Sequence, residues 1–198
     1  LKYGSIFDLP LSIRLKNRWP YLSVALKNFS LVVYLVTEIL KSRKAKIEAL
    51  REFIPNAKPE DWERFVKLNM YGLMNGCHAV LPGMIEKKWG RIVAITSESW
   101  RAAVPMGIAA YAASKAGVVG FVRQLAAEVG RKGVNVNALS LGTMNNWEGS
   151  EELARKNCII PRAGSPADVG AGVAWLAARE AEWVPGQIMP LNGGGITA

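Results

Sequence analysis

The sequence predicts an α/β fold with a mostly parallel sheet and helices on both of its faces. From residue 59 onward, segments with helical patterning alternate with short strand-like segments. Gly90 stands before the first of these strand-like segments and Gly133 opens the second, where turns are needed. Because 198 residues is the usual length of one domain, we expect residues 1–198 to form a single domain.

Three helices are expected in this part of the chain. The first spans residues 59–81; it opens with acidic residues, which suit the positive end of a helix dipole, and it stops before Pro82. The second spans residues 111–129, and the third runs from a Ser165 cap to about residue 178. Strands between such helices must run parallel, since each helix carries the chain back across the sheet.

The strands are expected at residues 91–96, 133–138 and 187–191. The first is a short apolar run after the Gly90 turn, as in strands that are buried on both faces, and the second reads Gly133-Val-Asn-Val-Asn-Ala138. The third contains Pro190, which cannot donate a backbone hydrogen bond and therefore suits an edge strand.

Residues 1–52 do not share this alternation, and we expect them to form an atypical basic segment. Residues 1–58 hold 11 of the 25 Lys and Arg but 4 of the 16 Asp and Glu, which is +7 of the formal charge of +9. This asymmetry indicates either an arm for nucleic acid or a membrane surface, or a segment unrelated to the rest. Within it, residues 24–40 suit a helix or a strand, and residues 41–53 suit a helix.

Composition excludes several classes of protein. Half of the residues are hydrophobic and 21% are charged, so wholesale disorder is excluded. The two cysteines, Cys77 and Cys158, cannot build a disulfide framework, and with the one histidine they predict no metal site. The longest early apolar run, residues 31–36, is far shorter than the roughly 20 residues of a membrane span. We therefore expect a cytoplasmic protein without a membrane partner.

Tyr111 and Lys115 form the first candidate for chemistry, because residues four apart share one face of a helix. A lysine ammonium about 4 Å from a phenol would lower the phenol pKa from about 10 to near 7. A tyrosine with such a pKa can pass a proton to or from an alcohol or carbonyl oxygen. The pair alone is a weak motif, since chance places such pairs in many chains.

Two predicted strand ends strengthen this interpretation. The strand at residues 91–96 ends at Ser97, with Ser99 as an alternative, and the next strand leads to Gly142. In a parallel α/β sheet, ligands bind beyond the carboxyl ends of the strands. A serine at this edge can donate a hydrogen bond to a substrate oxygen, so the helix and both strand ends point to one site.

Residues 53–198 resemble the short-chain dehydrogenase/reductase family. The resemblance rests on motifs in the family's order and at near-family spacing: Asn69-Met-Tyr-Gly72, Gly90-Arg-Ile-Val-Ala-Ile-Thr-Ser97, Tyr111-Ala-Ala-Ser-Lys115, Val134-Asn-Val-Asn-Ala138 with Gly142, Pro161-Arg-Ala-Gly164, and Gly186-Gln187 with Asn192-Gly-Gly194. It implies a Rossmann-like fold and an NAD(P)-dependent oxidoreductase acting on a small alcohol or ketone by hydride transfer.

The resemblance also implies roles for individual residues. Tyr111 would be the general acid/base. Lys115 would lower the Tyr111 pKa and hold the ribose hydroxyls next to the nicotinamide. Ser97 would polarise the substrate oxygen, and Asn69 would anchor a proton-relay water.

The cofactor implied by the family is NAD or NADP, with Gly142 and Thr143 at its nicotinamide end beside Tyr111 and Lys115. Leu141 departs from the family's proline before Gly142 and should loosen that loop. Residues that flank the site and could line an apolar substrate pocket are Trp100, Met144 and Trp147. The family resemblance implies a homodimer or homotetramer, formed through helices 60–81 and 111–129, without a nucleic-acid partner.

The cofactor-binding half of the family is not recognisable. The Gly-x-x-x-Gly-x-Gly turn and the Asn-Asn-Ala-Gly stretch are both missing from the sequence. Residues 72–78 imitate the first motif, but they lie in the helix expected over 59–81 and are interpreted as helix packing. Three functions therefore stay open: an active oxidoreductase, a truncated or frame-disrupted member that cannot bind cofactor, and a non-enzymatic module with a basic N-terminal arm.

Overall fold

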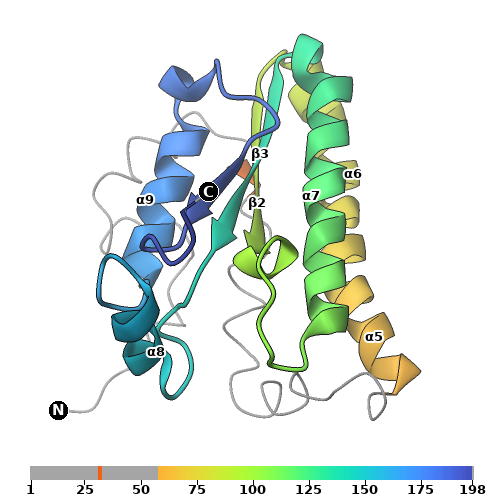
Figure 1. Ribbon diagram of the computed structural model, residues 1–198. Helices are drawn as coiled ribbons and strands as arrows, with labels where there is room; N and C mark the ends of the chain where they lie inside the picture. Colours follow the sequence, from red (N-terminus) through yellow and green to blue (C-terminus); the bar gives the residue numbers. More distant parts are fainter. Residues whose placement is uncertain (1–30, 33–57, 198) are drawn as a thin grey trace, which may run out of the picture.

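The computed structural model describes residues 31–32 and 58–197, and in them a parallel sheet lies between two layers of helices (Figure 1). The strands follow one another in space in the order β1-β2-β3-β4. Their bounds are Leu31–Val32 (β1), Gly90–Ser97 (β2), Val134–Leu141 (β3) and Ile188–Leu191 (β4), and every neighbouring pair runs parallel. The predicted α/β class and the parallel sheet are confirmed.

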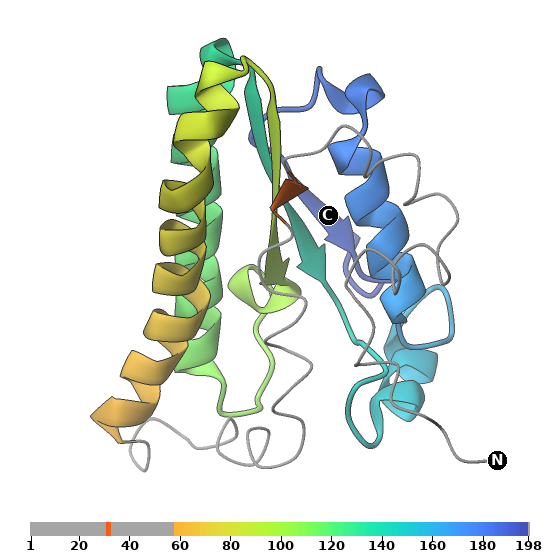
Figure 2. The same ribbon diagram turned by 180° about the vertical axis from the view of Figure 1, so that it is seen from behind.

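Helices cover both faces of this sheet. Figure 2 shows α5, α6 and α7 on one side of it and α9 on the other, with α8 next to α9. The α-helices are α5 (Pro59–Val66), α6 (Gly72–Glu86), α7 (Ala109–Val129), α8 (Ser150–Asn157) and α9 (Pro166–Ala177). The short helical turns are η3 (Lys67–Tyr71, a π-helix), η4 (Glu98–Trp100), η5 (Gly130–Lys132) and η6 (Arg179–Ala181).

The core has two parts because β2 and β3 are covered on both faces. The first part lies against α6 and α7 and includes Ile92 and Ala94 of β2. The second part lies against α9 and includes Val93 and Ile95 of β2 together with Leu176.

Alternate residues of a strand point to opposite faces, so both sets of side chains are buried in a doubly covered strand. The apolar run at residues 92–95 reflects this burial. In β3, the buried Asn135 and Asn137 instead form hydrogen bonds with the backbone of residues 181–182 and of Gln187.

The helix predicted over residues 59–81 begins at Pro59 as expected, but its predicted end is wrong. Helical structure continues through η3 and α6 to Glu86, with Pro82 inside it. A proline removes one backbone hydrogen bond, the one to the carbonyl four residues earlier. Here both Pro82 and His78 are exposed, so water can satisfy the carbonyl that loses its partner.

The other predicted elements are present with small shifts. The helix expected at residues 111–129 starts two residues earlier, and the strand expected at 133–138 extends to Leu141 because its later residues are also buried between two layers. Ser165 caps α9, accepting a hydrogen bond from the Asp168 backbone, while the Asp168 carboxylate accepts one from the Ser165 backbone. Pro190 lies in β4. Among the described strands, β4 pairs with β3 alone.

One helix, α8, was not predicted from the sequence. It is a two-turn polar helix that follows Gly149, whose φ of 85° lies in the left-handed region. The sequence did contain a helix signal: Glu151 and Glu152 lie in the first turn and basic residues in the last, as the helix dipole favours. The helix or strand predicted at residues 24–40 lies outside the described residues except for Leu31–Val32, which form a strand. The helix predicted at 41–53 and the remainder of the 1–52 segment also lie outside them.

Candidate active site

The predicted catalytic residues gather at the carboxyl end of β2. Ser97 is the last residue of β2, and Tyr111 and Lys115 lie one turn apart near the start of α7. The two elements are held together by Thr96, whose hydroxyl donates a hydrogen bond of 3.0 Å to the Lys115 backbone carbonyl. The strand end and the helix face predicted from sequence therefore meet.

Lys115 is almost fully buried, with 3% of its surface exposed. Its Nζ donates a hydrogen bond of 3.0 Å to the Ile95 carbonyl oxygen and lies 5.7 Å from the centre of the Tyr111 ring. Burial lowers the pKa of Lys115 to about 8. An ammonium group has three N–H donors, and the one bond found within the described residues leaves two for a ligand.

Tyr111 does not have the low pKa that the sequence predicted. Burial raises its pKa above the ordinary value of 10, and a hydrogen bond from Ser97 opposes that rise. The expectation that Lys115 would bring the Tyr111 pKa near 7 is wrong here, because desolvation outweighs every favourable interaction of the phenolate. The hydrogen bond does come from Ser97, whereas the Ser99 hydroxyl is buried without a partner among the described residues.

Asn69 lies in the π-helical turn η3 and is buried. Its amide donates a hydrogen bond of 2.9 Å to the Ser114 hydroxyl, which itself donates to the Tyr111 backbone carbonyl at 2.7 Å. A π-turn widens a helix locally and is frequent at functional sites. The structure therefore connects Asn69 to the helix turn that carries Tyr111, although the water-anchoring role predicted for it stays a prediction.

The loop after β3 approaches the loop after β4 closely. The Gly142 amide donates to the Leu191 carbonyl at 3.1 Å, and a Cβ on Gly142 would lie 2.7 Å from the Asn192 Cα. The Thr143 carbonyl accepts a hydrogen bond from the Gly164 amide. Gly142 is thus required by packing, and contact of Gly142 and Thr143 with a nicotinamide stays a prediction.

Glu98 is a buried residue at this edge that sequence reasoning did not select. It follows Ser97 directly and forms an ion pair of 2.7 Å with Arg101. The sequence could have indicated this ion pair, since a carboxylate after a buried strand and an arginine three residues later can pair across one helical turn. Trp100 donates a hydrogen bond of 3.1 Å to the Ser140 hydroxyl, and its lining of a substrate pocket stays a prediction. Met144 forms an isolated bridge with Gly164.

Residues 72–78, which imitate a glycine-rich turn, lie within α6 as predicted. Cys77 among them is buried in the core cluster, and burial raises the pKa of its thiol to about 11. Within residues 31–32 and 58–197, no three side chains of the metal-ligating types come together. None of the helices in this part of the chain combines the length and apolarity that a membrane crossing requires.

Comparison with known proteins identifies the family. The model of the family described as Enoyl-(Acyl carrier protein) reductase matches residues 38–195, about four fifths of the chain. Nodulation protein G of Azospirillum brasilense is 34% identical over 149 residues, covering 72% of this chain and 60% of that protein. A 3-oxoacyl-[acyl-carrier-protein] reductase of Vibrio cholerae is 34% identical over 143 residues, covering 69% and 58%. The chain belongs to the short-chain dehydrogenase/reductase family.

Solved structures agree with this assignment and with a Rossmann-like fold. A 3-oxoacyl-[acyl-carrier protein] reductase of Brucella melitensis with bound NAD superposes with a TM-score of 0.72 at 31% identity, covering 76% of this chain and 58% of that one. A gluconate 5-dehydrogenase of Burkholderia cenocepacia in complex with NADP and tartrate gives 0.70 at 26% identity, covering 75% and 61%. The chain spans about three fifths of the length of the proteins it matches.

A second similarity covers the start of the chain. The model of the malate:quinone oxidoreductase family matches residues 1–68. A probable malate:quinone oxidoreductase of Pseudomonas putida is 53% identical over 62 residues, which is 31% of this chain and 12% of that protein. The two family matches overlap over residues 38–68, so the basic segment resembles a different oxidoreductase family from the rest of the chain.

Proposed function

We propose that residues 58–197 are the catalytic half of an NAD(P)-dependent oxidoreductase that interconverts an alcohol and a ketone. The observation that carries this proposal is the convergence of Ser97, Tyr111 and Lys115 at the carboxyl end of β2. A bound nicotinamide supplies or accepts the hydride at the carbonyl carbon, and the residues of the chain handle the oxygen and its proton.

Each residue has a distinct part in ketone reduction. The Ser97 hydroxyl hydrogen-bonds the ketone oxygen and polarises it, and the Tyr111 phenol donates its proton to that oxygen as the alcohol forms. A raised Tyr111 pKa keeps the phenol protonated at neutral pH, which suits the acid role in reduction. Lys115, with donors left over from its bond to Ile95, would hold ribose hydroxyls beside the nicotinamide.

The residues present fit the nicotinamide end of the cofactor better than the adenosine end. What supports this fit is the buried Lys115 ammonium, with N–H donors beyond its bond to Ile95, and the Gly142 loop, which packs closely on Asn192. Gly4 is the one glycine in the first 58 residues, so their sequence contains no glycine-rich motif for a pyrophosphate. We therefore propose, as a second candidate, that the 198-residue chain binds whole cofactor poorly because its first residues resemble another family.

Turnover tests the first candidate. The names of the relatives favour a 3-oxoacyl thioester, so acetoacetyl-CoA is the probe, with NADH or NADPH oxidation followed by absorbance. We expect slow turnover that needs unusually high cofactor concentrations and is lost in Tyr111→Phe. Equal rates for the wild type and Tyr111→Phe would overturn the assignment of this site, and no turnover by either would overturn the activity proposed for this chain.

Affinity for a cofactor fragment tests the second candidate. Reduced nicotinamide mononucleotide carries the nicotinamide and its ribose without the adenosine half. If the adenosine platform is absent, NADH should bind no more than a few-fold more tightly than this fragment in a fluorescence titration. Two or more hydrogen bonds to a pyrophosphate, each worth about 1.5–3 kcal/mol, would give NADH an advantage of about 100-fold or more. An advantage of that size would show that a working platform exists.

A further inference from the structure

The turn η4 determines where the Ser97 hydroxyl points. Ser97 Oγ accepts a hydrogen bond of 3.3 Å from the Ser99 backbone amide, so the side chain caps this turn. The backbone amides of Arg101 and Ala102 both donate to the Glu98 carbonyl at 3.0 Å and close the turn. A movement of η4 would therefore move the hydroxyl that hydrogen-bonds Tyr111.

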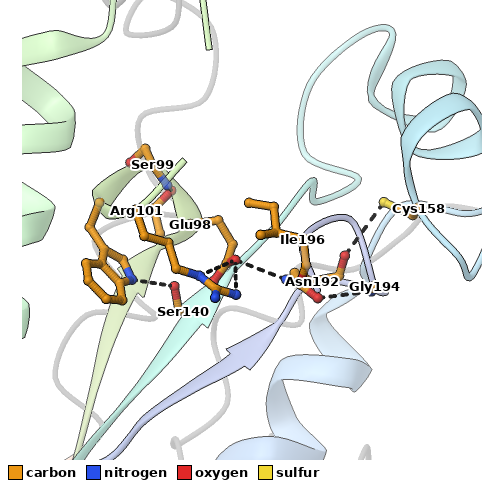
Figure 3. A network of polar contacts seen from close by, with 10 residues as sticks. Glu98, Ser99, Arg101, Ser140, Cys158, Asn192, Gly194 and Ile196 are labelled. Atoms are coloured by element: carbon orange, nitrogen blue, oxygen red, sulfur yellow. Dashed lines mark hydrogen bonds and ion pairs between the residues drawn. The ribbon is translucent and has the colours of Figure 1, made fainter. Parts of the chain in front are cut away.

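The Glu98 side chain connects η4 to the loop after β4 (Figure 3). Glu98 Oε2 accepts hydrogen bonds from Arg101 Nε at 3.0 Å and Nη2 at 2.7 Å, and a third from Asn192 Nδ2 at 3.0 Å. Asn192 follows the last residue of β4, and its side chain also donates to the Ile196 carbonyl and accepts from the Gly194 amide. One carboxylate oxygen thus holds two loops together.

A second connection joins the same turn to β3. Trp100 Nε1 donates a hydrogen bond of 3.1 Å to the hydroxyl of Ser140, a fully buried residue near the end of that strand. The Arg123 guanidinium lies over the Trp100 ring at 5.7 Å from its centre. Through Glu98 and Trp100, η4 is bound to the ends of both β3 and β4 as well as to its own strand.

The Glu98 carboxylate is costly to keep in this place. Its side chain is 8% exposed, and Oε1 is buried without a hydrogen-bond partner among the described residues. Apolar residues of similar volume usually replace a buried ion pair with no loss of stability. A gain in stability is therefore a weak explanation for a carboxylate here, and its contacts with Arg101 and Asn192 point to a structural role in joining two loops.

We propose that Glu98 is a positioning residue, which acts with Asn192 to hold the Ser97 hydroxyl against Tyr111. The inference rests on the proposed function, because it concerns the same Ser97–Tyr111 contact. It adds that this contact depends on the loop after β4, which lies about 90 residues further along the chain. Glu98 does not touch the reacting atoms; it acts through η4 and Ser97.

The pKa of Tyr111 reports on this contact without turnover. The full chain is labelled with ¹³Cζ-tyrosine, and the Tyr111 signal is identified by its absence in Tyr111→Phe and titrated with alkali. Ser97→Ala should raise the Tyr111 pKa, since it removes the hydrogen bond that opposes the effect of burial. Glu98→Ala and Asn192→Ala should each produce at least half of the rise seen in Ser97→Ala.

Two control variants separate positioning from general loosening of the fold. Glu98→Gln keeps an oxygen that can accept from Arg101 and Asn192, so the Tyr111 pKa should stay at the wild-type value. Asn135→Ala removes buried hydrogen bonds of 2.9 and 3.1 Å at the opposite end of β3 and should leave that pKa unchanged. Circular dichroism at each pH establishes that every variant is folded.

The inference is overturned if Glu98→Ala leaves the Tyr111 pKa at the wild-type value while Ser97→Ala raises it. It is also overturned if Asn135→Ala raises that pKa as much as Glu98→Ala does. A failure of the proposed function is distinguishable, since it would appear as absent turnover with the Tyr111 pKa still responding to Glu98→Ala.

Discussion

Lys115 should make the stability of the chain rise with pH between about 8 and 10.5. Burial lowers its pKa to about 8 in the folded chain, whereas an unfolded lysine has a pKa of about 10.5. Below pH 8 the side chain is charged in both states, and the folded chain bears the full cost of burying that charge. Since a pKa difference of one corresponds to about 1.4 kcal/mol, this cost is about 3 kcal/mol.

The sign of the effect follows from proton binding. Between about pH 8 and 10.5 the folded chain has released the Lys115 proton while the unfolded chain still binds it, so raising the pH favours the folded state. From pH 7 to 9.5 the gain should be about 2 kcal/mol. With a urea dependence of ~2 kcal/mol per molar, the midpoint should shift by roughly 1 M.

The assay compares urea unfolding of the wild type with Lys115→Met at pH 7 and 9.5. The substitution also leaves the Ile95 carbonyl without its donor, but that loss does not depend on pH and cancels between the two measurements. Thr96→Val, which removes the neighbouring hydrogen bond to the Lys115 carbonyl without a titratable group, should differ from the wild type by a constant amount. If the wild type gains nothing relative to Lys115→Met at pH 9.5, Lys115 does not have a lowered pKa.

Three further outcomes are expected. Gly133→Ala should lower the free energy of unfolding by at least about 2 kcal/mol, because φ is 86° and a Cβ would lie 2.1 Å from the Lys88 carbonyl oxygen. Gly130→Ala should raise it by up to about 1 kcal/mol, because φ is −56° and nothing lies within 4 Å of the added Cβ. Both are measured by thermal or urea unfolding, and equal effects of the two substitutions would refute this contrast. Hydrogen bonds from Arg162 and Ser165 hold the pKa of Asp168 well below its ordinary value. The thermal stability lost in Asp168→Asn should therefore be large at pH 7 and shrink as the pH falls below about 4. A loss of stability that does not change with pH would contradict this prediction. Cys77, whose thiol pKa is raised to about 11, should react with a disulfide reagent at pH 8 only after unfolding, as measured in Cys158→Ala; fast reaction of the folded variant would show that Cys77 is accessible.

The sequence predicted the sheet well because β2 and β3 are buried on both faces. Residues 92–95 of β2 form an apolar run, whereas β3 alternates valine with the buried Asn135 and Asn137. Gly133, with its left-handed backbone, marks the turn before β3. The ends of helices were harder to predict. Pro82 does not end α6, because Pro82 and His78 are exposed and water can bind the carbonyl that loses its hydrogen bond. The polar helix α8 was missed because it has few apolar positions from which a period can be read.

Local spacing was enough to find Ser97, Tyr111 and Lys115, but it did not give their energetics. The Coulomb argument for a low Tyr111 pKa took account of the lysine charge and omitted the desolvation of the phenol, which the structure shows to dominate. The link between Glu98 and Asn192 was not predicted either. Asn192 is distant from Glu98 in the sequence, and no pattern along the chain indicates that their two loops meet at one carboxylate.

Charge and glycine content both change near residue 58, and the two family matches overlap around it, over residues 38–68. The first 58 residues carry +7 of the +9 charge and one glycine, and the match to malate:quinone oxidoreductases reaches residue 68. The basic composition of this segment thus coincides with a similarity to a second family. Of the first 57 residues, the two described ones pair as β1 with Arg91 and Ile92, at the edge of β2 away from β3. The edge that carries Ser97 can therefore be assembled from β2, β3 and β4 alone, and the weak binding of a whole dinucleotide that we propose concerns the segment before them.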